Sequence, residues 1–239
     1  MKTHIRRREN NKELIIVFGG WGIDQNAFIP LCTEAHDFIL YYNYSADEPL
    51  VLPDRKTYGL VVLIGWSLGV WAAEYMSESM NLNPDINIAV NGTPVPADNR
   101  YGIPLDIFEG TLNNINEAGM EKFNIRLFGS KSILEENTEK LSRRSIASYS
   151  AELRWLYNRI MENPDKKYRW DIALSSIHDR VFPPDNQINY WKNRKDTRHL
   201  TVDLPHYPFY HWGTFNNMIK DLLDRTGLNF EENAYHGNG

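Results

Sequence analysis

Residues 60–69 read LVVLIGWSLG, an apolar run that ends in the pattern G-x-S-x-G. The first part, Leu60–Ile64, predicts a strand buried on both faces, and Val70–Met80 predicts the helix that follows it. A serine on the sharp turn between them needs glycine two residues before and after it, because a Cβ there would collide with the neighbouring strand and helix backbone. Such a turn exposes the serine hydroxyl, so Ser67 is a candidate nucleophile.

Short apolar runs recur on both sides of this stretch and alternate with helical segments. Further strands are predicted at Leu14–Phe18, Phe38–Tyr42, Ile86–Val90, Trp170–Ile177 and His199–Leu204. Helices are predicted at Asn26–Ala35, Pro184–Trp191 and Trp212–Leu223. The alternation of strand and helix is the order of a parallel α/β sheet.

Residues 101–163 interrupt this alternation, because their apolar positions follow helical spacing and no strand-like run occurs among them. We predict a helical cap at 99–164, inserted over the C-terminal ends of the strands, where open α/β sheets place their ligands. The core domain would then comprise 1–98 and 165–228, and 229–239 would form a polar tail.

Composition excludes several classes of protein. The chain has 239 residues, and its 31 acidic against 26 basic residues give a formal net charge of -5, which argues against a nucleic-acid binder. Its single cysteine, Cys32, excludes an intramolecular disulfide and fits a reducing compartment. Met1–Lys12 lacks the apolar core of a signal peptide, and no later segment is apolar for long enough to span a membrane. We expect a cytoplasmic protein with no membrane partner.

A serine hydroxyl is a weak nucleophile until a base takes its proton, so Ser67 needs a histidine and, usually, a carboxylate that orients it. With the serine on such a turn, the acid and then the histidine follow it along the chain. Asp179 stands in the loop after the strand predicted at Trp170–Ile177, where an acid can reach the base. Asp171 lies at the other end of that strand, and Asp185 suits a helix N-cap. These positions favour Asp179 as the acid.

Two histidines compete for the role of the base. His206 directly follows the last predicted strand in a loop stiffened by Pro205 and Pro208, whereas His211 opens the last helix and could cap it or pack against it. Chain order and position favour His206, and an assisting role for His211 stays open. No His, Cys or acidic cluster has the spacing of metal ligands, so we expect neither a metal nor another cofactor.

Acyl transfer also needs hydrogen-bond donors directed at the oxyanion that forms. One donor would be the backbone N–H of Leu68, directly after the serine. The other should come from the loop after the first buried strand, where residues 18–22 read FGGWG. The spacing of these glycines fits neither the dinucleotide-binding nor the Walker pattern, so we take the N–H of Trp21 as the second donor.

Five segments carry a resemblance to a known family: FGGWG at 18–22, GWSLG at 65–69, NGTP at 91–94, HDR at 178–180 and HYPF at 206–209. Together they resemble the motifs of the α/β-hydrolases and, more closely, of the pimeloyl-acyl-carrier-protein methyl ester esterases of bacterial biotin synthesis. Within that family the chain looks most like the compact branch found in Bacteroides relatives and other bacteria. The resemblance implies the α/β-hydrolase fold, a mostly parallel sheet flanked by helices with a helical cap insertion.

The resemblance also implies roles for individual residues: Ser67 as nucleophile, His206 as base, Asp179 as its orienting acid, and Trp21 and Leu68 as oxyanion donors. It further implies that basic cap residues bind the phosphopantetheine phosphate and the acidic acyl carrier protein. The candidates lie in one predicted helical stretch and are Arg143, Arg144, Arg154 and Arg159. Nearby glutamates leave open the alternative that these arginines form a solvated helix face.

The activity expected from the resemblance is that of a serine carboxylesterase. It would remove the methyl group of the pimeloyl ester while the acyl chain stays thioester-linked to its carrier. One alternative is a broad small-acyl carboxylesterase or thioesterase, since fold does not fix substrate. Another is a non-catalytic protein that binds a ligand under the cap, although the intact order of serine, acid and histidine speaks against it.

Overall fold

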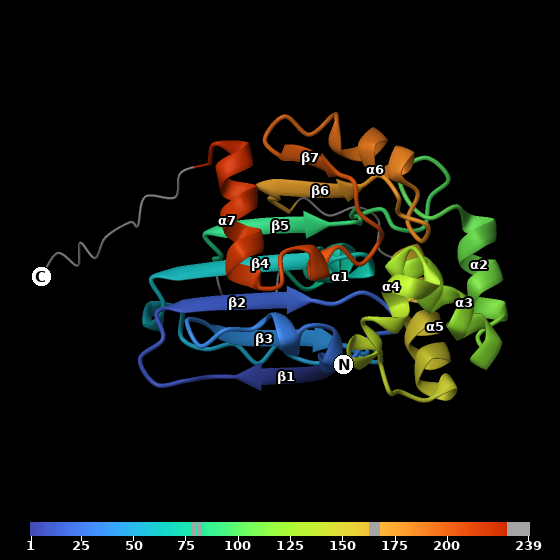
Figure 1. Ribbon diagram of the computed structural model, residues 1–239, viewed down its shortest axis with the longest axis horizontal. Helices are drawn as coiled ribbons and strands as arrows, with labels where there is room; N and C mark the ends of the chain where they lie inside the picture. The colour runs from blue at the N-terminus through green and yellow to red at the C-terminus, as the bar shows by residue number, and fades with distance from the viewer. Residues whose placement is uncertain (78–79, 81–82, 163–167, 229–239) are drawn as a thin grey trace, which may run out of the picture.

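Seven strands form one sheet in the order β1-β3-β2-β4-β5-β6-β7 in a computed structural model that describes residues 1–77, 80, 83–162 and 168–228 (Figure 1). The strands are β1 (Lys2–Arg6), β2 (Glu13–Phe18), β3 (Asp37–Tyr42), β4 (Leu60–Trp66), β5 (Ile86–Val90), β6 (Ile172–Ser176) and β7 (Arg198–Val202). All neighbouring pairs are parallel except β1 and β3. The predicted class, a mostly parallel α/β sheet, is confirmed.

The antiparallel edge strand β1 has no counterpart in the sequence prediction. Its residues KTHIR are mostly polar and lie half-buried or exposed, as an edge strand with one free side allows. By contrast, every residue of β3, β5 and β6 is buried, because helices cover both faces of a parallel sheet. The sequence prediction therefore identified the inner strands and the edge strand β7, and it missed the edge strand β1.

The helices are α1 (Leu68–Met76), α2 (Leu105–Asn113), α3 (Glu117–Phe128), α4 (Lys131–Glu135), α5 (Ile146–Glu162), α6 (Pro184–Trp191) and α7 (Phe215–Thr226). The bounds predicted for α6 are confirmed. Helix α7 begins three residues later than predicted, because the Thr214 side chain caps its first turn by accepting a hydrogen bond from the N–H of Asn217. It ends at Thr226, and Gly227 directly after it adopts the left-handed conformation with a φ of 65°.

The helix predicted at Asn26–Ala35 is wrong. The segment forms two short 3-10 turns, Gln25–Ala27 and Ile29–Leu31, and Cys32 then has extended backbone. Pro30 explains the interruption, because it has no N–H to donate within a helix and disfavours helical backbone at the residue before it.

Helices α2–α5, which we call the cap, fill the segment between β5 and β6. Figure 1 shows them grouped beyond the C-terminal ends of the parallel strands, while α7 crosses one face of the sheet. Residues 229–239, predicted as a tail, lie outside the described part of the chain. Among the described residues, no helix has the length and apolar character needed to cross a membrane.

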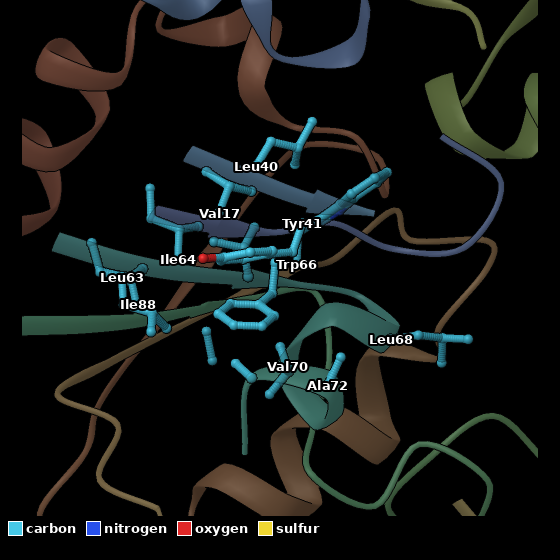
Figure 2. Packing of buried hydrophobic residues seen from close by; sticks show 14 of the residues in the cluster. Val17, Leu40, Tyr41, Leu63, Ile64, Trp66, Leu68, Val70, Ala72 and Ile88 are labelled. Atoms are coloured by element: carbon cyan, nitrogen blue, oxygen red, sulfur yellow. The ribbon is translucent and has the colours of Figure 1, made fainter. Parts of the chain in front are cut away.

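The core that positions Ser67 is built where β2–β5 meet α1. Figure 2 shows side chains from these elements packed together: Val17, Leu40, Tyr41, Leu63, Ile64, Trp66, Leu68, Val70, Ala72 and Ile88. Trp66 is fully buried at the end of β4, and its indole Nε1 donates to the backbone oxygen of His206 at 2.9 Å. The core therefore ties the residue before Ser67 to the loop after β7.

Candidate active site

Ser67 occupies a strained turn between β4 and α1. Its backbone has φ 57° and ψ -127°, a conformation that costs free energy for any residue other than glycine. The steric reason for the flanking glycines is confirmed, because an added Cβ at Gly65 would lie 2.8 Å from Val70 Cα. At Gly69 an added Cβ would lie 2.0 Å from the carbonyl oxygen of Phe18. A side chain at either position would therefore force the neighbouring backbone to move.

His206 and Asp179 come together although they follow different strands. The His206 Nδ1 and Asp179 Oδ2 atoms are 2.6 Å apart, and both side chains are almost completely buried. The second carboxylate oxygen, Oδ1, accepts hydrogen bonds from the N–H groups of Val181 and Phe182, each at 2.8 Å. An imidazole that donates its Nδ1–H to a carboxylate keeps Nε2 free to accept a proton. The pair therefore has the chemistry of an oriented base.

The competing residues lie elsewhere. Asp171 stands at the start of β6, where it accepts a hydrogen bond from the N–H of Asn87 at 2.8 Å and pairs with Arg169. Asp185 is exposed in the first turn of α6. His211 is exposed and packs its ring against Trp212 at 5.0 Å. Within the described part of the chain, Asp179 and His206 are the only candidate acid and base that form a hydrogen-bonded pair.

Sequence reasoning assigned no role to two amides that support this pair. The Asn91 Nδ2 donates to the backbone oxygen of His206 at 2.8 Å, and its Oδ1 accepts from the N–H of Ser176 at 2.7 Å. The Gln187 Nε2 donates to Asp179 Oδ2 at 2.9 Å. Asn91 carried a signal, because it ends a buried strand just before a glycine, whereas nothing in the sequence singled out Gln187.

The loop after β2, residues 19–22, lies directly against Ser67. An added Cβ at Gly20 would lie 2.9 Å from the Ser67 Cβ. The N–H of Trp21 meets no acceptor among the described residues. Leu68 is the first residue of α1, where a backbone N–H has no acceptor within the helix. Both predicted oxyanion donors are thus free to bind an oxygen beside the serine.

An apolar pocket opens over Ser67 at the inner side of the cap. It is narrow and includes Phe108, Leu153 and Val181 in its lining. A wider outer cavity of about 510 Å³ lies beside it against α2 and α3. The two cavities share five wall residues: Trp21, Ile107, Thr111, Phe123 and Arg126. The shared residues show that the two cavities are direct neighbours.

Two cations and no carboxylate line the outer cavity. Lys122 and Arg126 stand one turn apart on α3, and the other lining residues are uncharged. The Arg126 Nε is buried without a hydrogen-bond partner among the described residues. Together, the side chains that line this cavity are therefore positively charged, in a chain whose formal net charge is -5. No group of His, Cys, Asp or Glu within the described residues is arranged to hold a metal ion.

The predicted carrier-binding arginines do not share one helix. Arg143 and Arg144 precede α5, whereas Arg154 and Arg159 lie within it. Arg154 and the side chain of Arg143 are exposed. Arg159 pairs with Asp47 at 2.7 Å, so part of its charge is balanced within the chain.

Arg144 requires a correction, because its side chain is only 7% exposed and pairs with the buried carboxylate of Glu152 at 2.7 Å. The guanidinium also donates to the backbone oxygen of Ile23 and to the side chain of Asn43. The guanidinium of Arg144 is therefore largely enclosed and bound by partners within this chain, rather than offered to a carrier at the surface.

Comparison with known proteins identifies relatives. The model of one protein family, described as "Pimeloyl-ACP methyl esterase BioG", matches residues 1–218. The chain is 37% identical over 184 residues to malonyl-[acyl-carrier protein] O-methyltransferase of Bacteroides fragilis, a match that covers 76% of this chain. The chain spans only about a third of that relative, because the match covers 37% of its length.

Solved structures agree with this match. The crystal structure of BioG from Haemophilus influenzae has a TM-score of 0.80 at 32% identity, covering 90% of this chain and 98% of that one. An esterase from Exiguobacterium antarcticum has a TM-score of 0.63 at 15% identity, covering 95% of each chain. The second likeness shows the fold alone.

Proposed function

Since the chain belongs to the BioG family of α/β-hydrolases, we propose that it is a serine carboxylesterase that hydrolyses the methyl ester of pimeloyl-acyl-carrier protein in biotin precursor synthesis. The observation that carries this proposal is the buried Asp179–His206 pair, tied through Trp66 to the strained turn of Ser67, which lines an apolar pocket. The relative from Bacteroides fragilis is named for an acyl-carrier-protein substrate, which supports a carrier-linked ester here.

The first half of the proposed reaction transfers the acyl group to the enzyme. The Ser67 Oγ attacks the ester carbonyl carbon while His206 Nε2 takes the hydroxyl proton. The negative charge on the carbonyl oxygen is bound by the N–H groups of Trp21 and Leu68. When the intermediate collapses, the bond to the methoxy oxygen breaks and His206 gives its proton to that oxygen. Methanol leaves, and the pimeloyl group remains on Ser67.

The second half returns the enzyme to its starting state. His206 takes a proton from water, the resulting hydroxide oxygen attacks the acyl carbonyl, and the same two N–H groups bind the oxyanion. Collapse breaks the bond to Ser67 Oγ, which recovers its proton from His206. The product is the free distal carboxylate, with the thioester to the carrier intact.

The two neighbouring cavities offer an account of selectivity. The narrow apolar pocket over Ser67 suits a methylene chain and a small methyl ester. We propose that the acyl chain passes through it and that the carrier arm lies in the outer cavity, where Lys122 and Arg126 face its anionic groups. Exposed Arg143 and Arg154 remain candidates for contact with the acidic carrier.

The test is methanol release from methyl-pimeloyl-carrier protein, followed together with the mass of the carrier product. The wild-type protein should release methanol and leave the thioester intact, whereas Ser67→Ala and His206→Ala should release none above background. Turnover of simple esters without methanol release from the carrier-linked ester would contradict the proposed substrate assignment and favour a broad esterase. Cleavage of the thioester would favour a thioesterase. Wild-type protein inactive on all of these substrates would favour a ligand-binding protein.

A further inference from the structure

The buried carboxylate of Glu152, on cap helix α5, holds backbone groups beside the active site. Glu152 is 0% exposed. Its Oε2 accepts from the N–H of Gly22 at 3.1 Å and from Arg144 Nη1 at 2.7 Å, and its Oε1 accepts from the N–H of Tyr44 at 3.1 Å. Gly22 directly follows Trp21, whose own N–H is the proposed oxyanion donor. The cap therefore contacts the backbone of the loop that carries this donor.

The side chain of Trp21 is held by the same helix. Its indole Nε1 donates to the backbone oxygen of Tyr149 on α5 at 2.8 Å. Its ring also packs edge-on against Phe123 of cap helix α3, with the centroids 4.8 Å apart. Tyr149 precedes Glu152 by three residues, so both contacts come from one face of α5. Helix α5 thus holds both the side chain of Trp21 and the peptide group between Trp21 and Gly22.

The contact to Gly22 matters because this residue has a φ of 83°, in the region that glycine alone enters readily. Backbone there has alternative conformations of similar energy, and a change of Gly22 would move the adjacent Trp21 peptide. A carboxylate that accepts the Gly22 N–H selects one conformation. Arg144 adds a second contact to this loop, because its guanidinium pairs with Glu152 and donates to the backbone oxygen of Ile23 at 2.9 Å.

We propose that Glu152 is a positioning residue for ester hydrolysis, which holds the loop at 19–22 so that the N–H of Trp21 points at the oxyanion. The inference rests on the proposed function, since an oxyanion forms only if Ser67 attacks a carbonyl. It also makes the cap part of the catalytic geometry, because α5 cannot shift without moving the donor. Burial of the Glu152 carboxylate costs free energy, which its contacts must offset. An ion pair with Arg144 alone does not require the carboxylate to lie at this position beside the loop.

The test compares Glu152→Gln, which keeps the size of the side chain, with Glu109→Gln. Glu109 is a second cap carboxylate, which accepts a hydrogen bond from the Tyr157 hydroxyl at 2.6 Å and does not touch the loop at 19–22. Because Glu152→Gln leaves Arg144 without its counter-charge, the double variant Glu152→Gln with Arg144→Met removes the stranded cation together with the Arg144 contact to Ile23. Melting curves establish a temperature at which every variant is folded.

Two ligands separate positioning from general damage. A trifluoromethyl ketone forms a tetrahedral adduct with Ser67 and needs the oxyanion donors, whereas the intact ester bound to the Ser67→Ala background does not. We expect Glu152→Gln and the double variant to lower kcat and the ketone affinity about 10- to 100-fold, because small misplacement of a donor has costs of this order. KM and ester affinity in the Ser67→Ala background should change less than about twofold. Glu109→Gln should match the wild type throughout.

Unchanged kcat and ketone affinity in a folded Glu152→Gln would overturn the inference and leave the proposed function standing. Equal losses of ketone and ester affinity would also overturn it, because they would indicate a distorted pocket. A wild-type protein that neither hydrolyses the ester nor binds the ketone would overturn the proposed function, and the inference with it.

Discussion

Replacing Gly69 with alanine should damage both stability and activity, although the change adds one methyl group to a helix. The new Cβ would lie 2.0 Å from the carbonyl oxygen of Phe18 and 2.6 Å from its carbonyl carbon. Ordinary contact begins near 3.4 Å, so α1 and the end of β2 would have to separate by more than about 1 Å in a packed interior that resists such expansion.

The expected magnitudes follow from that displacement. Overpacking of a buried site costs about 1–3 kcal/mol, which lowers Tm by about 2–12 °C for a chain of this length. Gly69 lies two residues after Ser67 and next to Leu68, so the proposed nucleophile and one proposed oxyanion donor must shift together. A displacement of about 1 Å costs on the order of 10²-fold in rate. We therefore expect kcat to fall at least about 100-fold.

Gly110 in α2 provides the matched control, because it is also a helical glycine but an added Cβ there meets nothing within 4 Å. Gly110→Ala should stabilise the protein by about 0.5–1 kcal/mol through helix propensity alone. The assay is a urea melt of each variant together with kcat on a small ester. If Gly69→Ala matched Gly110→Ala in both measurements, the steric account of the G-x-S-x-G turn would be refuted.

Three further predictions concern the surroundings of the site. Asn91→Ala removes the amide that binds the His206 backbone oxygen. We expect the free energy of unfolding from a urea melt to fall by about 1–3 kcal/mol and kcat to fall as well. Wild-type values of both would contradict this. Burial lowers the pKa of His36 below 6.5, so the unfolded chain binds the His36 proton more tightly than the folded chain does. The free energy of unfolding should therefore keep its full value above pH 6.5 and fall below that pH by at most about 1.4 kcal/mol per pH unit. An unchanged slope of this free energy against pH in His36→Gln would count against this. Charge reversal at Arg143 and Arg154 should weaken turnover of the carrier-linked ester and spare a small ester, whereas equal loss on both would show a structural role.

What the sequence predicted well depends on local constraints. The glycines around Ser67 exclude a Cβ for reasons of close backbone approach, and such constraints leave a pattern in five consecutive residues. Strand β5 and helix α6 were predicted at their observed bounds, because a short buried apolar run and a helix that begins at proline are local signals. By contrast, polar edge strand β1 carries no apolar pattern, since only part of its surface is buried.

Errors and omissions at the site arose from contacts between distant residues. Arg144 was expected at the surface, yet it is enclosed by partners that include Ile23, 121 residues away in the chain. The role of Asn91 depends on His206, which lies 115 residues away. No local pattern reports such contacts. The fold and the order of the candidate triad could therefore be predicted from the sequence, whereas the supporting amides and the buried ion pair could not.

Covalent labelling by a fluorophosphonate, located by peptide mass spectrometry, tests directly whether Ser67 is a nucleophile activated by His206. We predict a single adduct on the peptide that contains Ser67, absent in Ser67→Ala and formed far more slowly in His206→Ala. An adduct on another residue, or labelling of Ser67 at the same rate without His206, would contradict it.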